Sequence, residues 1–309
     1  MKMTPSQEIL HLSLLMQEEL LQRMSPARYA AKMGLEPYPW QSHLMDSRKK
    51  RKLVNGARQG GKSTTVAVLP AWMAHFKPGS LSIVAAAVEK QAWEDMNKIK
   101  AFVSKDPCLI VKRASDELLE FENGSRILVV PATERSARGW SAPALILLDE
   151  ASRIPDPVYT SGIRPMLTHN PLCEVLAIST PNGREGFFAR AWESDRWEKY
   201  EVRAPWDIVE TTWELVPALP EREFVAERLR RGILGSYSPR HKLLAEQTEN
   251  LLEMGARMYR QEYLCEFVET EGAAFRYSDI DAMMGNQVEG LDTDTTAVLD
   301  ELEALVFDE

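Results

Sequence analysis

The sequence predicts an α/β fold, in which a mostly parallel central sheet is covered by helices and joined to a small helical lid subdomain. Short apolar segments alternate with helical patterns from residue 52 onward, as in parallel sheets that are buried on both faces. The glycine-rich motif Gly56–Ser63 lies between the first predicted strand and a helix, and a later apolar strand ends in Asp149 and Glu150. These observations together indicate the P-loop NTPase class of α/β folds.

The N-terminal part is predicted to be helical. Apolar residues recur at helical spacing over residues 6–24. Ser25 and Pro26 are a typical N-cap and first-turn pair for a short helix that stops at Gly34. The turn 37–41 then leads into a third helical stretch, which ends in the basic run Arg48–Lys52.

From residue 52 the pattern predicts strands and helices in alternation. The predicted strands are Lys52–Asn55, Leu81–Ala87, Ala144–Leu148 and Val175–Ser179, together with a hairpin formed by Glu117–Glu122 and Ser125–Pro131 around Asn123-Gly124. The predicted helices are Lys62–Phe76, with a kink at Pro70, and Glu89–Ser104. Three further helices are predicted for the lid, over Glu221–Arg231, Pro239–Met254 and Ala256–Phe267.

Charge is unevenly distributed along the chain. The net charge is −9, but residues 271–309 carry eleven carboxylates and one arginine, while residues 1–270 are nearly neutral at +1. We therefore divide the chain into an N-terminal helical segment (1–36), a P-loop core (37–204), a helical lid (205–270) and an acidic tail (271–309). The tail either restrains the body by competing for a basic face, binds a partner through its last apolar residues, or only solubilises the chain.

Composition excludes several other classes of protein. Apolar residues make up 44% of the chain, enough for a substantial core. No apolar run approaches the ~18 residues of a membrane-spanning helix, and no secretory signal precedes the body, so no membrane partner is expected. The three cysteines, Cys108, Cys173 and Cys265, lie far apart and are typical of reduced thiols in a cytoplasmic protein.

The motif Gly56–Ser63 matches G-x-x-x-x-G-K-[ST] at every fixed position. Its glycines allow backbone N–H groups to point at the β-phosphate, and Lys62 adds a positive charge for the β- and γ-phosphates. The Ser63 hydroxyl is the expected ligand of Mg²⁺. The predicted ATP-binding residues of the loop are Gly56, Ala57, Arg58, Gln59, Gly60, Gly61, Lys62, Ser63 and Thr64.

Asp149 and Glu150 are the expected second half of this site. The apolar strand delivers Asp149 to the carboxyl edge of the sheet, where Mg²⁺ must bind, and Glu150 is then placed to polarise the attacking water. The alternative is a strand that ends in two carboxylates which cap the next helix. Two arginines are candidates for stabilising the transition state: Arg58 within the loop, and Arg138 in the polar segment 133–141, with Arg135 as a competitor for the second role.

These residues together resemble the ATPase domain of the large terminase subunit, the motor that packages DNA in tailed phages. The similarity extends from about residue 37 to residue 270. It rests on Tyr38–Gln41, Arg58–Ser63, Leu147–Ala151, Ile178–Gly183 and Tyr259–Phe267. The combination is far more specific than a phosphate loop alone.

The resemblance implies roles for several residues. Gln41 would contact adenine, Arg58 would be the arginine that acts in cis, Arg138 would act across a ring of subunits, and Thr180 would sense the γ-phosphate. Double-stranded DNA would be the molecule that the motor translocates, and the portal and the small terminase would be its protein partners. A phage or prophage protein of this kind would work in the host cytoplasm. Independently of the resemblance, the charge of the run Arg48–Lys52 is typical of a solvated helix end, and contact with DNA phosphates is the alternative.

Only 39 residues follow Thr270, whereas large terminases usually continue into a nuclease of well over a hundred residues. We therefore expect no nuclease domain in this chain and a separate nuclease as a partner; Asp292 and Asp294 have no room for further carboxylates. Another nucleic-acid ATPase, such as a helicase, is the alternative function, but it requires a second RecA-like domain. A non-catalytic scaffold would be expected to lack Lys62 or Glu150, and both are present.

Overall fold

A computed structural model describes residues 5–58, 60–133, 140, 142–203, 250, 253–255 and 257–268. Residues 1–268 form one compact unit, and residues 269–309 form a second unit that lies outside the described residues. No helix in the described part combines the length and the apolar character needed to cross a bilayer. The predicted helices 221–231 and 239–254 fall almost entirely outside the described residues.

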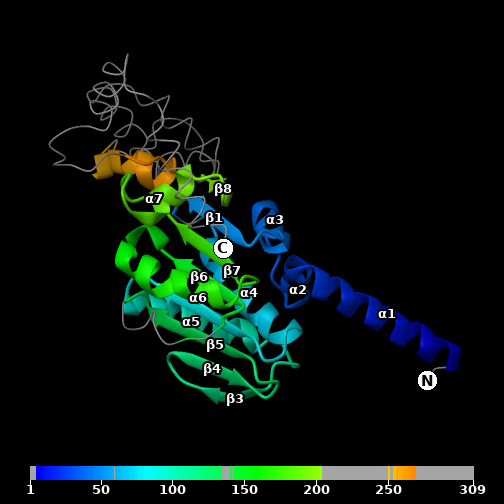
Figure 1. The fold of residues 1–309 in the computed structure, drawn as a ribbon. Coiled ribbons are helices and arrows are strands. Elements are labelled where there is room, and N and C mark those ends of the chain that lie inside the picture. Colours follow the sequence, from blue (N-terminus) through cyan, green and yellow to red (C-terminus); the bar gives the residue numbers. More distant parts are fainter. Residues whose placement is uncertain are drawn as a thin grey trace, which may run out of the picture. The chain divides into compact units, whose positions relative to one another are not determined.

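Three helices precede the sheet (Figure 1): α1 (Pro5–Met24), α2 (Pro26–Lys32) and α3 (Pro39–Asp46). The predicted cap is confirmed, since the Ser25 hydroxyl accepts the Arg28 N–H at 3.1 Å and donates to Asp46 Oδ2 at 2.8 Å. α1 runs away from the sheet, and most of its large apolar side chains are exposed. Helix α1 therefore contributes little to the core.

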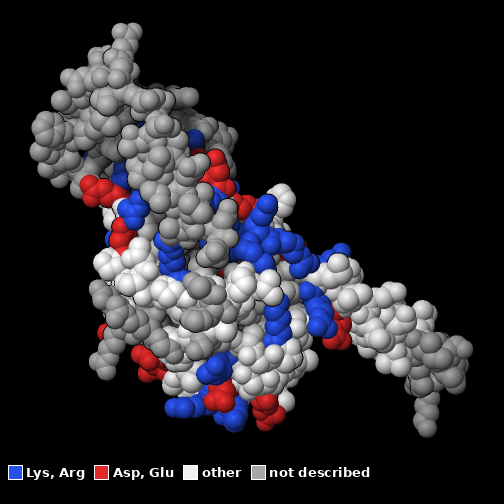
Figure 2. All heavy atoms as spheres, in the orientation of Figure 1, with Lys and Arg blue, Asp and Glu red and all other residues white. Residues whose placement is uncertain are grey.

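Lysine and arginine side chains gather beside α3, between α3 and α2 (Figure 2). Within the basic run, Arg48, Lys49 and Lys50 are exposed, whereas Lys52 is fully buried. Lys52 Nζ pairs with Glu174 Oε2 at 3.1 Å, so this residue cannot contact DNA. The run is therefore divided into an exposed part and a structural part.

The sheet has eight strands in the order β3-β4-β5-β2-β6-β7-β1-β8. Strands β5, β2, β6, β7, β1 and β8 pair in parallel, and β3, β4 and β5 pair antiparallel at one edge. The bounds are β1 Arg51–Gly56, β2 Leu81–Ala86, β3 Val111–Ala114, β4 Leu118–Phe121, β5 Arg126–Pro131, β6 Leu145–Asp149, β7 Glu174–Ser179 and β8 Glu198–Val202. The predicted mostly parallel sheet and the hairpin between β4 and β5 are confirmed.

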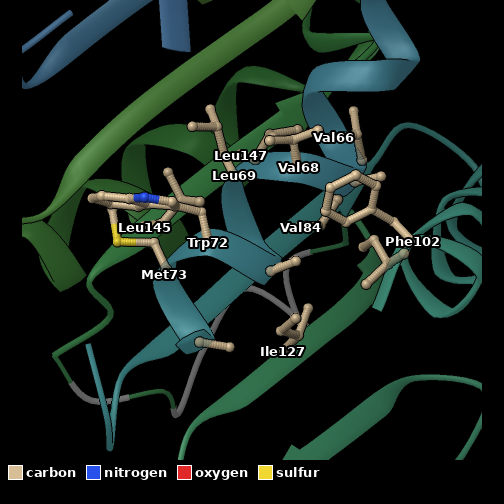
Figure 3. Packing of buried hydrophobic residues seen from close by; sticks show 14 of the residues in the cluster. Val66, Val68, Leu69, Trp72, Met73, Val84, Phe102, Ile127, Leu145 and Leu147 are labelled. Carbon is tan, nitrogen blue, oxygen red and sulfur yellow. The ribbon is translucent and has the colours of Figure 1, made fainter. Parts of the chain in front are cut away.

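Helices cover both faces of this sheet. The covering elements are α4 (Lys62–Phe76), α5 (Glu89–Val103), the short turn η1 (Ala151–Arg153), the π-helical η2 (Val158–Ile163), α6 (Arg164–His169) and α7 (Gly186–Glu193). Alternate residues of each strand enter opposite cores: in β6, Leu145 and Leu147 pack with α4 and α5, while Ile146 and Leu148 pack with η2, α6 and α7. Figure 3 shows Trp72 and Leu69 of α4 beside the β6 side chains. Burial on both faces explains why the central parallel strands β2, β6 and β7 are mostly apolar.

Several elements differ from the sequence-based expectation. β3, β8, η2, α6 and α7 were not predicted, and α4 is helical on both sides of Pro70. The helix predicted over 256–267 is observed at 257–263 and ends there because Cys265 adopts a left-handed backbone with φ of +60°. Residues 265–268 follow the helix without regular secondary structure.

Candidate nucleotide site

A cavity of about 610 Å³ opens at the carboxyl ends of β1, β2, β6 and β7, which is where ligands bind in open α/β sheets. Its lining residues are Arg58, Gly60, Gly61, Lys62, Ser63, Ala87, Val88, Gln91, Glu150, Arg153 and Thr180. The structure thus brings the phosphate loop, Glu150 and Thr180 together, as the sequence predicted. Asp149 lies beside the cavity at the end of β6.

The phosphate loop is folded tightly around Lys62. Lys62 Nζ donates to the carbonyl oxygens of Gly56 at 2.6 Å and of Ala57 at 2.9 Å, which leaves one of its three donors for a phosphate. A Cβ on Gly56 would lie 2.9 Å from Lys62 Cδ, so a larger residue would displace the lysine. Gly61 precedes α4 with φ of +81°, a conformation that favours glycine. Burial lowers the pKa of Lys62, against the opposing charges of Glu150 and Asp149.

Asp149 is a buried carboxylate with the properties of a metal ligand. It is 3% exposed, and Gln91 Nε2 donates to its Oδ2 at 2.8 Å. Burial and the charge of Glu150 raise its pKa, against the opposing effects of hydrogen bonds with Asp95 and Gln91 and of the charge of Lys98, which forms no ion pair with Asp149 among the described residues. A divalent cation would supply the missing positive charge, and the Ser63 hydroxyl lines the same cavity. Asp149 and Ser63 therefore fit a Mg²⁺ ion bound with the nucleotide.

Glu150 is held in an unusual backbone conformation. Its φ and ψ are +51° and +46°, in the left-handed region that residues with a Cβ rarely adopt. The Ser179 hydroxyl lies 3.3 Å from Glu150 Oε2 and 2.8 Å from the Ser152 hydroxyl. This backbone turns the chain out of β6, so that Glu150 lines the cavity while Asp149 remains within the strand.

Arg58 faces the cavity and is anchored from behind by a residue far along the chain. Its Nε donates to Glu262 Oε2 at 2.7 Å, and its backbone N–H donates to the Glu262 carbonyl at 3.1 Å. Asn55 Nδ2 likewise donates to the Cys265 carbonyl at 2.7 Å. The loop is therefore held between β1 and the segment 257–268, part of the predicted lid.

Gln41 lies against the phosphate loop but does not line the cavity. Its Oε1 accepts the Tyr38 N–H at 2.7 Å, and its Nε2 donates to the Gly61 carbonyl at 2.7 Å. Contact with adenine thus remains a prediction, while a structural role at Gly61 is observed. Gln59, Arg135 and Arg138 lie outside the described residues, so their predicted roles also remain predictions.

Sequence reasoning missed four residues of this region: Gln91, Asp95, Arg153 and Glu262. Gln91 and Asp95 lie one turn apart on α5, and Asp95 is fully buried next to Asp149. Burial and the charge of Asp149 raise the pKa of Asp95 to about 8. The sequence of α5, the helix that follows β2, does not indicate that Gln91 and Asp95 face Asp149. Glu262 lies inside the quoted stretch Tyr259–Phe267, which is the signal that could have identified it.

Comparisons with known proteins agree with this geometry. Residues 53–282 match the family described as "Terminase large subunit, T4likevirus-type, N-terminal". No curated protein matches the chain. The ATPase domain of the Thermus phage P74-26 large terminase superposes with a TM-score of 0.58 at 21% identity, over 79% of this chain and 99% of that chain; a point variant of the same domain gives 0.60 at 20% identity over 79% and 100%.

The large terminase of bacteriophage HK97 gives a TM-score of 0.53 at 16% identity, over 75% of this chain and 51% of that chain. The chain thus spans about half the length of that terminase. Structural similarity at these identities supports the fold, and the family match covers most of the chain. The resemblance noted from the sequence is confirmed: the chain belongs to the family of terminase large subunits, which it matches over their N-terminal part.

Proposed function

We propose that this chain is the ATP-hydrolysing motor subunit that moves double-stranded DNA into a phage procapsid. The observation that carries the proposal is that the phosphate loop and Glu150 line one cavity, with Asp149 beside it at the end of β6, in a member of the large terminase family. The loop follows β1, whereas the metal-binding carboxylate and the base both stand at the end of β6, two strands away in the sheet. A protein that only bound nucleotide would not need Glu150 at this position.

The roles of the residues follow from their positions. Backbone N–H groups of the loop at the start of α4, from Gly61 to Ser63, and the ammonium of Lys62 hold the β- and γ-phosphates. Ser63 and Asp149 would hold Mg²⁺, which supplies positive charge to the phosphate oxygens. Glu150 orients the attacking water and accepts its proton, while Arg58 neutralises charge on the γ-phosphate. Thr180 senses that phosphate, and its position in the cavity lining directly after β7 supports this role.

We further propose that the motor works as a ring of identical subunits. Arg138, or Arg135 in its place, acts on the nucleotide of a neighbouring subunit, and Gln41 contacts adenine. Residues 37–204 are the ATPase core, 205–270 the lid and 271–309 an acidic tail. The portal and the small terminase are the protein partners, and the exposed residues Arg48–Lys50 are candidates for DNA phosphates.

One set of measurements tests the proposal. ATP turnover is measured with and without duplex DNA, with the Lys62→Ala variant as the control for contaminating ATPase. We expect turnover in the wild type, stimulation by duplex DNA and no strand separation. Strand separation would favour the helicase alternative. An absence of nucleotide binding and turnover in the folded protein would refute the proposal.

A further inference from the structure

Arg153 lies in the nucleotide cavity, although sequence reasoning gives it no role. Its side chain lines the cavity together with Arg58, Lys62 and Glu150. It ends η1, the short turn that begins directly after Glu150, and its N–H donates to the Glu150 carbonyl at 2.9 Å. Arg153 is therefore fixed by the backbone next to the residue that we assign as the base.

Arg153 and Arg58 share one buried carboxylate. Glu262 is fully buried; its Oε2 lies 2.7 Å from Arg58 Nε, and its Oε1 lies 3.8 Å from Arg153 Nη2. The arginine side chains themselves are 57% and 47% exposed. A buried carboxylate needs a positive partner, and here two arginines on the cavity side provide it. Glu262 thus draws both guanidinium groups to one wall of the cavity.

Both arginines retain donors for an anion in the cavity. A guanidinium has five N–H donors in a planar fork, and Arg58 directs only Nε and Nη2 toward Glu262. Within the described part of the chain, the guanidinium of Arg153 makes no hydrogen bond and only the 3.8 Å ion pair. Such a pair of forks matches the geometry of a phosphate group.

We propose that Arg153 is a second arginine that binds the terminal phosphate of ATP beside Arg58, and that Glu262 positions both. This inference rests on the proposed ATPase function. The terminal phosphate competes with Glu262 for the two guanidinium groups. ADP lacks this phosphate, so Arg153 distinguishes the triphosphate from the diphosphate.

The test measures the affinities of AMP-PNP and ADP, with Mg²⁺, by isothermal titration calorimetry. Arg153→Gln should weaken AMP-PNP binding by about tenfold to a hundredfold, the range of a charged hydrogen bond, and change ADP binding by less than about threefold. Arg190→Gln is the matched control. Arg190 is similarly exposed and pairs with Asp156 at 2.6 Å, but it does not line the cavity. The control should leave both affinities unchanged.

Glu262→Gln tests the competition between Glu262 and the terminal phosphate, because it removes the charge of Glu262 but keeps an acceptor that can position Arg58. The amide oxygen can still accept the Arg58 Nε–H, but it no longer competes as an anion, so AMP-PNP should bind about tenfold more tightly while ADP affinity stays the same. The gain should be smaller when Arg153→Gln is added, because one of the two arginines is then missing. If Glu262 had a purely structural role, its replacement would change the affinities for AMP-PNP and ADP together.

The inference is overturned if Arg153→Gln weakens AMP-PNP and ADP equally, or matches the Arg190→Gln control. If Glu262→Gln fails to fold, the Arg153 comparison still decides, because Arg153 is half exposed and its loss leaves Glu262 paired with Arg58. A wild type that binds neither nucleotide refutes the proposed function itself. A wild type that binds and hydrolyses ATP while Arg153→Gln is indistinguishable from it refutes only this inference.

Discussion

Replacing Glu150 by glycine should leave a more stable fold than replacing it by alanine, while both changes abolish turnover. Glu150 has a left-handed backbone, with φ of +51°, at the point where the chain leaves β6. Strain of this kind is often found at functional sites. The matched reference is Glu150→Ala, which also removes the carboxylate and its contact with Ser179 but keeps the Cβ.

The magnitude follows from the backbone. The left-handed conformation costs a residue with a Cβ about 1–2 kcal/mol, and glycine escapes most of this strain. Glycine in turn loses about 0.5–1 kcal/mol more conformational freedom on folding. The Glu150→Gly variant should therefore be about 0.5–1 kcal/mol more stable than Glu150→Ala, or roughly 1–4 °C higher in melting temperature for a domain of this size.

Thermal unfolding followed by circular dichroism measures this difference, and a coupled assay measures turnover. Both variants should lose about 10²–10⁴-fold in turnover, because each lacks the base. Glu120, on strand β4, is the control position: its backbone is not left-handed, so glycine there should be less stable than alanine. A Glu150→Gly variant that melts at or below Glu150→Ala would refute the assignment of strain to this residue.

The remaining predictions concern the nucleotide, the ring, acid stability and the tail. Lys62→Ala should abolish ATP binding and hydrolysis, whereas Glu150→Ala should still bind ATP; near-normal turnover in Glu150→Ala would contradict the assigned base. Turnover per subunit should rise with protein concentration, and mixing Arg138→Ala with Lys62→Ala subunits should restore activity; assembled mixtures without any gain would count against the trans role. Burial raises the pKa of Asp106, but hydrogen bonds from His75 and Tyr29 outweigh burial and lower it. The stability that Asp106 contributes should be full above about pH 4 and should be lost as pH falls through its lowered folded-state pKa. The difference in unfolding free energy between the wild type and Asp106→Asn should therefore shrink in acid. A difference that stays constant from pH 6 to 3 would oppose this. Deleting residues 271–309 should leave basal ATPase unchanged, and only a tail that restrains the body predicts tighter DNA binding at low salt that vanishes at high salt. Unchanged DNA affinity at low salt would leave the docking and solubilising alternatives.

The central strands and the loop could be predicted from the sequence because each carries its own local signal. β2, β6 and β7 are continuous apolar runs, and β1 is located by the motif that follows it. The edge strands carried no such signal: β3 is exposed along its whole length, and β8 is largely charged, with the sequence Glu-Lys-Tyr-Glu-Val. Pairing with a neighbouring strand, rather than an apolar pattern, makes them strands.

At the nucleotide site, too, residues with a local sequence signal could be predicted, and residues that depend on tertiary contacts could not. Lys62, Ser63, Asp149 and Glu150 were predicted because fixed spacing reflects the fixed geometry of a phosphate and its metal. Glu262 was not, because its role depends on contacts with Arg58 and Arg153 that only the tertiary fold creates. A single sequence gives the motif but not the residues that hold it in place.

The phosphate loop is held by contacts between an early and a late part of the described chain, and this bears on how the chain folds. Asn55 and Arg58 bond to Cys265 and Glu262, which lie 210 and 204 residues further along the chain. β1 also pairs on both sides with strands that are synthesised much later, β7 and β8. Contacts over such sequence separations slow folding, because long loops must close before they form. During synthesis, the loop is therefore among the first parts to emerge and among the last to be completed, and the ability to hold ATP is expected to arise only once the segment up to residue 268 has joined the sheet.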